Sequence, residues 1–332
     1  MESCKKAVID LCCGLGGLSL AAQNIGLQPI IGVDICKNAL KTYQHNFAPI
    51  QSICNNIKKK KTIQTIIDTA KVLKKSQSEL IIVSGPPCQG FSVAGKRIID
   101  DPRNKIFVAV AKAISSIKPK AAIVENVSAV LFEKYSSYVS RFTKILKKSD
   151  YYVCPVLVNA ESFGTPQKRS RALFFITKKP VAKQCIEKLL ENEYKDPKTV
   201  SEVFAGLPVA PVRPDNYTDD LSANGIYNHF AMQHSAKVKK KIATIAPGTG
   251  PLSYRKLHPD KSAGALICGH RAPPAHFSES RSITAREAAR LQELPDNFII
   301  YGKHGSQIQQ VANAVPTALG QAALKVLLKI ME

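Results

Sequence analysis

The chain has 332 residues and a formal net charge of +22, from 47 Lys and Arg against 25 Asp and Glu. With 45% hydrophobic residues, 18 Gly and 20 Pro, the composition excludes wholesale disorder and collagen-like or low-complexity architecture. This length predicts one large domain or two modest ones. No continuous apolar run reaches the ~20 residues that span a bilayer. No secretory signal is visible, so a cytoplasmic protein is expected.

Charge and cysteine content narrow the function classes. Residues 1–177 hold 26 basic and 11 acidic side chains, whereas 178–283 hold 16 and 10. Such an excess favours a polyanionic partner, because basic side chains displace the counterions of a phosphate backbone. The nine cysteines contain no C-x-x-C pair, so neither a disulfide framework nor a metal site is expected.

The first 177 residues alternate between short apolar runs and longer amphipathic stretches. Strands are predicted at 7–10, 29–34, 80–85, 121–126, 153–160 and 171–177. Helices are predicted at 18–26, 37–47, 62–75, 104–117 and 141–149. Apolar runs without alternation, separated by helices, predict a parallel sheet that is covered on both faces.

From 178 to about 280 the pattern becomes irregular, with prolines clustered at 207–214. Thr284 and Glu287 form a capping-box start for a predicted helix at 284–294. The apolar stretch 317–332 predicts a terminal helix that packs back on the first domain. We therefore expect a catalytic and cofactor-binding domain at 1–177, completed by 300–332, and a smaller domain at 178–299.

A glycine-rich segment, Asp10-Leu-Cys-Cys-Gly14-Leu-Gly16-Gly17, follows the first predicted strand. Glycines at this place let the backbone approach a ligand and let the next helix face it with its N-terminus. Asp34 ends the second strand, where a carboxylate takes ribose hydroxyls. The spacing G-x-G-G is not the G-x-G-x-x-G of dinucleotide sites, so the segment by itself fits a cofactor loop or a tight turn.

Three further polar groups stand at the ends of predicted strands. Cys88 lies in Gly85-Pro-Pro-Cys-Gln-Gly90, a proline-shaped loop at the sheet edge where α/β folds bind ligands. Glu125 closes another strand, where a buried carboxylate is costly unless it is paired or used. Arg169 and Arg171, at i and i+2 in extended chain, point to one face and suit a carboxylate or phosphate. Structural roles remain the alternative for each group.

These motifs occur in an order that resembles the DNA (cytosine-5) methyltransferase family. The matching segments are D-L-x-x-G-x-G-G, G-P-P-C-Q-G-F-S, E-N-V, Q-K-R-x-R, R-x-x-T-x-R-E-x-A-R at 281–290 and Gln310-Val-Ala-Asn-Ala-Val-Pro316. The resemblance covers about 1–177 and 281–320. It implies an α/β fold, that of Rossmann-like S-adenosylmethionine-dependent methyltransferases, with a second, smaller irregular target-recognition domain in the remaining region.

The resemblance also implies a mechanism, that of the bacterial type of enzyme in this family. A methyl group would pass from S-adenosyl-L-methionine to C5 of a cytosine that is flipped out of a specific duplex sequence. Cys88 would add to C6, Glu125 would hold the N3/N4 edge, and Arg171 with Arg169 would bind O2. The segment 91–101 would close over the base. The other expected substrate contacts are Gln89, Ser92 and Arg97.

The cofactor pocket implied by the resemblance has three parts. Gly14, Gly16 and Gly17 would line the methionine end, Asp34 would take the ribose, and Ile57 would lie near the adenine. The remaining expected contacts are Asp10, Cys12, Ile35, Asn56, Pro86, Asn313 and Val315. The sequence departs from the family pattern at Cys12, usually an aromatic, at Asn56, usually an acid, and at Ala312, usually a glycine.

Other functions compete with this interpretation. The same scaffold methylates tRNA cytosine in eukaryotic relatives, but their C-F-T signature is missing here. A catalytically silent DNA binder and a Rossmann oxidoreductase are further alternatives. Double-stranded DNA is the expected partner, and no association with a membrane is expected. The enzyme is expected to be a monomer that is associated with the nucleoid. A cognate restriction endonuclease is a further candidate partner, and the recognition sequence stays open.

Overall fold

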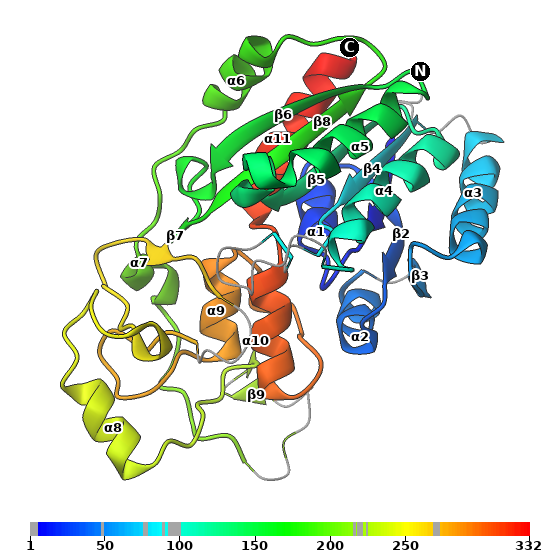
Figure 1. Ribbon diagram of the computed structural model, residues 1–332. Coiled ribbons are helices and arrows are strands. Elements are labelled where there is room, and N and C mark those ends of the chain that lie inside the picture. Colours follow the sequence, from blue (N-terminus) through cyan, green and yellow to red (C-terminus); the bar gives the residue numbers. More distant parts are fainter. Residues whose placement is uncertain are drawn as a thin grey trace.

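The centre of the protein is a seven-stranded sheet with the order β3-β2-β1-β4-β5-β8-β6 (Figure 1). The computed structural model describes residues 6–47, 50–75, 79–87, 90–91, 101–214, 217, 222–223, 225–267 and 273–332. The strands of the sheet are β1 (Lys6–Leu11), β2 (Gln28–Asp34), β3 (Gln51–Cys54), β4 (Glu79–Ser84), β5 (Ala121–Val127), β6 (Tyr152–Asn159) and β8 (Ser170–Thr177). All six predicted strands are present, and β3, which is short and only partly buried, was not predicted.

The prediction of a wholly parallel sheet is wrong at one edge. β8 lies antiparallel to both β5 and β6, whereas the pairs from β3 to β5 are parallel. A parallel neighbour of β6 would need a crossover of about a dozen or more residues, usually a helix. Residues 160–169 contain only a 3-10 turn and β7 (Gln167–Lys168), so the chain reverses and β8 inserts between β5 and β6.

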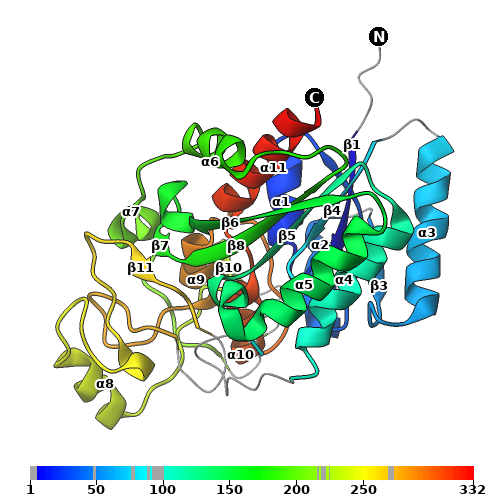
Figure 2. The same ribbon diagram turned by 45° about the horizontal axis from the view of Figure 1, so that its top comes forward.

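Helices cover both faces of the sheet, as predicted (Figures 1 and 2). In β1, Ile9 packs in one core and its neighbour Val8 packs in the other, because successive side chains leave a strand on opposite faces. The first face carries α3 (Lys60–Lys75), α4 (Asn104–Ile117) and α5 (Ser136–Lys147), and the second carries α1 (Gly17–Asn24), α6 (Lys183–Glu191) and α11 (Thr317–Met331).

The end of the chain returns to the first half, as expected for 317–332. The segment His304–Met331 has the length and hydropathy of a membrane-spanning helix, with 72% of its most apolar window buried inside the protein. It consists of two helices, α10 (His304–Asn313) and α11, separated by residues 314–316, which we call the α10–α11 turn. The apolar side chains of α11 pack against α1 and the sheet, which accounts for its composition.

The region after β8 is irregular, as its sequence predicts. Its remaining elements are short: α7 (Val200–Phe204), β9 (Ser222–Ala223), β10 (Ile226–Tyr227), α8 (Ala236–Ala243), β11 (Ala263–Gly264) and α9 (Ala285–Leu291). The capping box of α9 is confirmed, with both the Thr284 and the Glu287 bonds in place. A third core joins α7, α9 and α10 to α2 (Lys37–Asn46). The division into domains at 177/178 and 299/300 stays a prediction.

Candidate active site

The glycine-rich loop between β1 and α1 packs against the α10–α11 turn. Gly16 precedes α1 with φ 104°, in the left-handed region that favours glycine. A Cβ on Gly17 would lie 2.6 Å from the Val315 carbonyl oxygen, so only glycine allows this approach. The loop that follows the first strand is therefore shaped by a segment nearly 300 residues later in the chain.

Asp34 holds the same loop to the end of β2. One carboxylate oxygen accepts the Gly14 N–H and the other accepts the Cys36 N–H, both at 2.9 Å. Each carboxylate oxygen has a second lone pair, so Asp34 can also accept hydroxyl groups of a ligand. The next side chain, Ile35, is 66% exposed and offers an apolar surface beside this carboxylate.

Asp10 is a buried carboxyl group at the end of β1. Its Oδ2 accepts the Ser19 hydroxyl at 2.8 Å, while Oδ1 has no partner among the described residues. Burial, with a smaller contribution from the negative charge of Asp34, raises the pKa of Asp10 to about 7. The site therefore contains an acceptor that a cationic ligand group would satisfy. Ser19 was not identified from the sequence, although a hydroxyl in the first turn of α1 was a signal for it.

The two cysteines of the loop lie in an environment that disfavours the thiolate. Burial and the charges of Asp34 and Asp10 raise the pKa of Cys12 and of Cys13 well above the usual thiol value. Both side chains are therefore neutral thiols at physiological pH, and a thiolate is the nucleophilic form. Cys12 also has a positive φ of 60°.

The segment before α3 places the two residues expected near the adenine. Ile57 is 4% exposed and packs in the core. The side-chain oxygen of Asn56 accepts the Lys58 N–H at 2.9 Å, so this oxygen stabilises the local turn. Its amide group is the part of Asn56 that suits an adenine acceptor.

Glu125 and Arg171 form an ion pair across β5 and β8. The distance from Arg171 Nε to Glu125 Oε1 is 2.6 Å, and the side chains are only 12% and 8% exposed. The antiparallel register pairs Glu125 with Leu173 and Val127 with Arg171, so the ion pair is diagonal. A carboxylate and a guanidinium, both largely desolvated, thus lie at the end of β5, as the sequence led us to expect.

The loop after β4 starts beside this ion pair. A Cβ on Gly85 would lie 3.8 Å from both Glu125 Oε2 and Val315 Cγ2, so both side chains adjoin Gly85. The Asn126 side chain donates to the Pro86 carbonyl at 3.4 Å. The predicted site residues Cys88, Gln89, Ser92 and Arg97 lie outside the described residues.

The described ends of the segment expected to close over a target base are both buried. Phe91 is 1% exposed and packs on Phe107, Tyr135 and Tyr138. Tyr135 also donates to the Gly90 carbonyl at 3.0 Å. Asp101 is likewise buried, at 5% exposure. Residues 92–100 lie outside the described residues, so the closure of this segment over a base stays a prediction.

Arg169 lies next to Arg171 in sequence but makes different contacts. Its Nη2 donates to the carbonyls of Ala312 and Ala314 at 2.9 and 3.0 Å. Asn313, between them, is exposed. The expected contact of Arg169 with the base remains untested, and its contacts in the structure lead to the α10–α11 turn.

A family model described as C-5 cytosine-specific DNA methylase matches residues 6–329 of the chain. The chain belongs to this family. It is thus a DNA cytosine-5-methyltransferase, and its fold is the Rossmann-like fold of such enzymes.

Several relatives resemble this methylase over nearly its whole length. Type II methyltransferase M1.HphI of Haemophilus parahaemolyticus is 30% identical over 340 residues, which cover 97% of this chain and 86% of the relative. Type II methyltransferase M.DdeI of Desulfomicrobium norvegicum is 30% identical over 370 residues, which cover 95% and 86%. Among solved structures, a prophage-encoded E. coli protein assigned as a DNA modification methyltransferase has a TM-score of 0.79 and 26% identity, with 98% and 99% covered. The S. pombe Dnmt2 methyltransferase, at TM-score 0.66 and 15% identity, shares the fold.

C5 DNA methylases of this fold use S-adenosylmethionine as the methyl donor. Residues of the glycine-rich loop and of the end of β2 fit S-adenosylmethionine in three respects. The unpartnered Oδ1 of Asp10 suits an ammonium group, and Asp34 has free lone pairs for ribose hydroxyls. The exposed side chain of Ile35 suits the face of an adenine ring.

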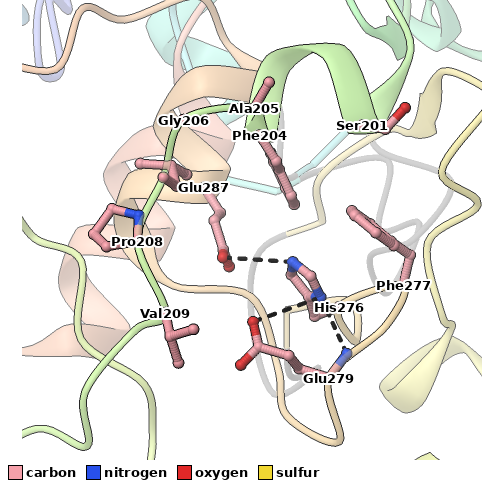
Figure 3. Close-up of a pocket in the computed structure, with 11 residues that line it drawn as sticks. Ser201, Phe204, Ala205, Gly206, Pro208, Val209, His276, Phe277, Glu279 and Glu287 are labelled. Atoms are coloured by element: carbon pink, nitrogen blue, oxygen red, sulfur yellow. Dashed lines mark hydrogen bonds and ion pairs between the residues drawn. The ribbon is translucent and has the colours of Figure 1, made fainter.

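The methylase also has a cavity of about 300 Å³ between α7 and the segment that leads into α9 (Figure 3). His276, Glu279 and Glu287 line it and lie close enough together to be metal ligands. Arg281, however, pairs with Glu287 at 2.7 Å and with Glu279 at 2.8 Å. The Arg281 guanidinium thus already pairs with both carboxylates, so the geometry supports an ion-pair network that stabilises the start of α9. Of these residues, the sequence analysis identified Glu287, in the capping box and the family motif, and Arg281, in the family motif, but not His276 or Glu279.

Proposed function

We propose that the chain methylates C5 of cytosine in a specific double-stranded DNA sequence, through a covalent bond between Cys88 and C6. The observation that carries the proposal is the buried Glu125–Arg171 ion pair at the end of β5. A Cβ on Gly85 would lie 3.8 Å from both Glu125 Oε2 and Val315 Cγ2, so the start of the Cys88 loop adjoins one proposed base residue and one proposed cofactor residue.

Cys88 is the proposed nucleophile because C5 of cytosine is itself a poor one. Addition of the thiolate to C6 makes the ring an enamine-like carbon nucleophile at C5, which accepts the methyl group. Loss of the C5 proton and elimination of the thiolate then restore the aromatic ring. Cys12 and Cys13, the thiols of the neighbouring loop, have raised pKa values and would remain protonated.

Glu125 and Arg171 would hold the flipped base in place. The Glu125 carboxyl group would meet the N3/N4 edge and offset the charge that develops at N3, and the Arg171 guanidinium would bind O2. Their mutual ion pair pre-orients both side chains before the base arrives, since each is largely buried.

S-adenosylmethionine supplies the electrophilic methyl group. The proposed cofactor residues are Asp10 for the ammonium, Asp34 for the ribose and Ile35 for the adenine face. Asn313, Val315 and Pro86 would close the pocket, together with the loop residues Cys12, Gly14, Gly16 and Gly17 and the pair Asn56 and Ile57. Gln89, Ser92 and Arg97 would contact the DNA.

The region 178–299 would read the DNA sequence, while much of the phosphate attraction would come from 1–177. The relatives named above are Type II methyltransferases, so we also propose a role in restriction–modification, with a cognate endonuclease as partner. The enzyme would act as a monomer on nucleoid DNA in the cytoplasm.

Covalent trapping tests the proposal. Duplex DNA with 5-fluorocytosine at the target should form a stable adduct on Cys88, because fluorine cannot leave as a cation. Cys88→Ser should abolish methyl transfer and the adduct while S-adenosylmethionine still binds. Bisulfite sequencing of DNA from expressing cells identifies the target beforehand. An adduct on Cys12, Cys13 or another thiol would contradict the assignment.

A further inference from the structure

Arg169 carries a buried guanidinium between β7 and β8. It is 3% exposed, and its backbone N–H donates to the Asn159 side chain at 3.0 Å. Its backbone carbonyl accepts the Ala160 N–H at 2.9 Å. The position of Arg169 is thus set by the end of β6, a rigid part of the sheet.

The guanidinium bonds two carbonyl groups near the end of α10. Nη2 donates to Ala312 in the last helical turn and to Ala314 immediately after the helix, at 2.9 and 3.0 Å. The last carbonyls of a helix have no intrahelical partner and carry partial negative charge. A buried cation with two N–H groups on one nitrogen can satisfy both carbonyls with charge-assisted hydrogen bonds.

Those carbonyls fix the turn that lines the glycine-rich loop. Val315 follows Ala314 directly, and its carbonyl oxygen lies where a Cβ on Gly17 would come within 2.6 Å. Its Cγ2 lies 3.8 Å from the position of a Cβ on Gly85. A shift of the α10–α11 turn would therefore change the surroundings of Gly17 in the glycine-rich loop.

We propose that Arg169 is a positioning residue for the cofactor pocket, whereas Arg171 serves the base. Arg169 acts through the α10–α11 turn, and Arg171, two residues later, pairs with Glu125. The two arginines of one motif thus serve different substrates: Arg169 supports the binding of S-adenosylmethionine, and Arg171 binds the cytosine. This inference rests on the proposed function, because it takes the glycine-rich loop as the binding site of S-adenosylmethionine.

Two measurements separate the roles. Calorimetry gives the Kd of S-adenosylmethionine. Exchange of tritium from C5 of the target cytosine, without cofactor, reports on the base residues alone. In this exchange the thiolate adds to C6, C5 takes a solvent proton, tritium leaves, and elimination of the thiolate restores cytosine.

Arg169→Met should raise the Kd of S-adenosylmethionine about tenfold or more, as expected for the loss of charge-assisted bonds. The rate of C5 exchange should stay within about twofold of wild type. A twofold change in rate corresponds to much less free energy than one charge-assisted hydrogen bond contributes. Arg171→Met should show the reverse, with exchange lost and the Kd retained. Lys168→Met, on the exposed neighbour, controls for the loss of positive charge. Arg169→Lys keeps the cation and should give an intermediate Kd, so it serves where the Met variant does not fold.

Loss of C5 exchange in either Arg169 variant with an unchanged Kd would overturn the inference, as would an equal loss of both. Failure of the proposed function would look different. Wild-type enzyme would then show no C5 exchange at all, while the Kd of S-adenosylmethionine would still report the effect of Arg169.

Discussion

Replacing Asp10 with asparagine should make the protein more stable at alkaline pH. Asp10 is buried at the end of β1, and its pKa is raised from 3.8 to about 7. The folded protein therefore binds a proton at Asp10 more tightly than the unfolded chain does. Its contribution to stability is fully present below about pH 4 and is lost as the pH rises through about 7. Asparagine has no such proton and no such dependence.

The size of the effect follows from the pKa shift. Each unit is equivalent to 1.36 kcal/mol, so a shift of about three units costs the folded state roughly 4 kcal/mol at high pH. Between about pH 5 and pH 8 the free energy of unfolding of wild type should fall by roughly 2–3 kcal/mol relative to Asp10→Asn. The same variant should bind S-adenosylmethionine more weakly, because it lacks the anion proposed for the ammonium.

Urea denaturation at several pH values, without cofactor, measures this difference. Asp68→Asn changes an exposed carboxyl group, with 59% of its side chain accessible, and should leave the pH dependence as in wild type. Ser19→Ala removes a hydrogen bond that lowers the pKa of Asp10, so the fall in stability should extend to higher pH. Parallel curves of unfolding free energy against pH for wild type and Asp10→Asn would show that the pKa of Asp10 is not raised in the folded protein.

Three more outcomes follow from the described contacts. Asp34→Ala should weaken S-adenosylmethionine binding by about 1.5–3 kcal/mol, roughly ten- to over a hundredfold, and unchanged affinity by calorimetry would assign the ribose elsewhere. Glu287→Gln should lower the free energy of unfolding by about 1.5–3 kcal/mol, because Arg281 would lose one of its two charged partners while Glu279 remains, and a urea midpoint near that of wild type would contradict this. Exchanging 180–275 for the matching region of a relative should change the methylated sequence and should change the salt dependence of DNA binding much less, and bisulfite sequencing together with binding at several salt concentrations checks both.

The sequence by itself determined the local elements and the family. The helix predicted at 104–117 has the same bounds in the structure, because its 3.6-residue apolar pattern is a local property. The capping box at Thr284 and Glu287 was likewise readable, since it joins residues three positions apart. The order of the motifs indicated the methyltransferase family without any knowledge of their contacts.

The tertiary structure alone decided how these residues act together. The direction of β8 depends on the connection after β6, and the pKa of Asp10 depends on how completely the sheet and α1 bury it. The spacing of Arg169 and Arg171 placed both on one face, but only their neighbours assign one to the α10–α11 turn and the other to Glu125. The spacing of two residues in a strand determines whether their side chains lie on the same face. Desolvation and ion pairing depend instead on segments that are distant in sequence and meet only in the folded protein.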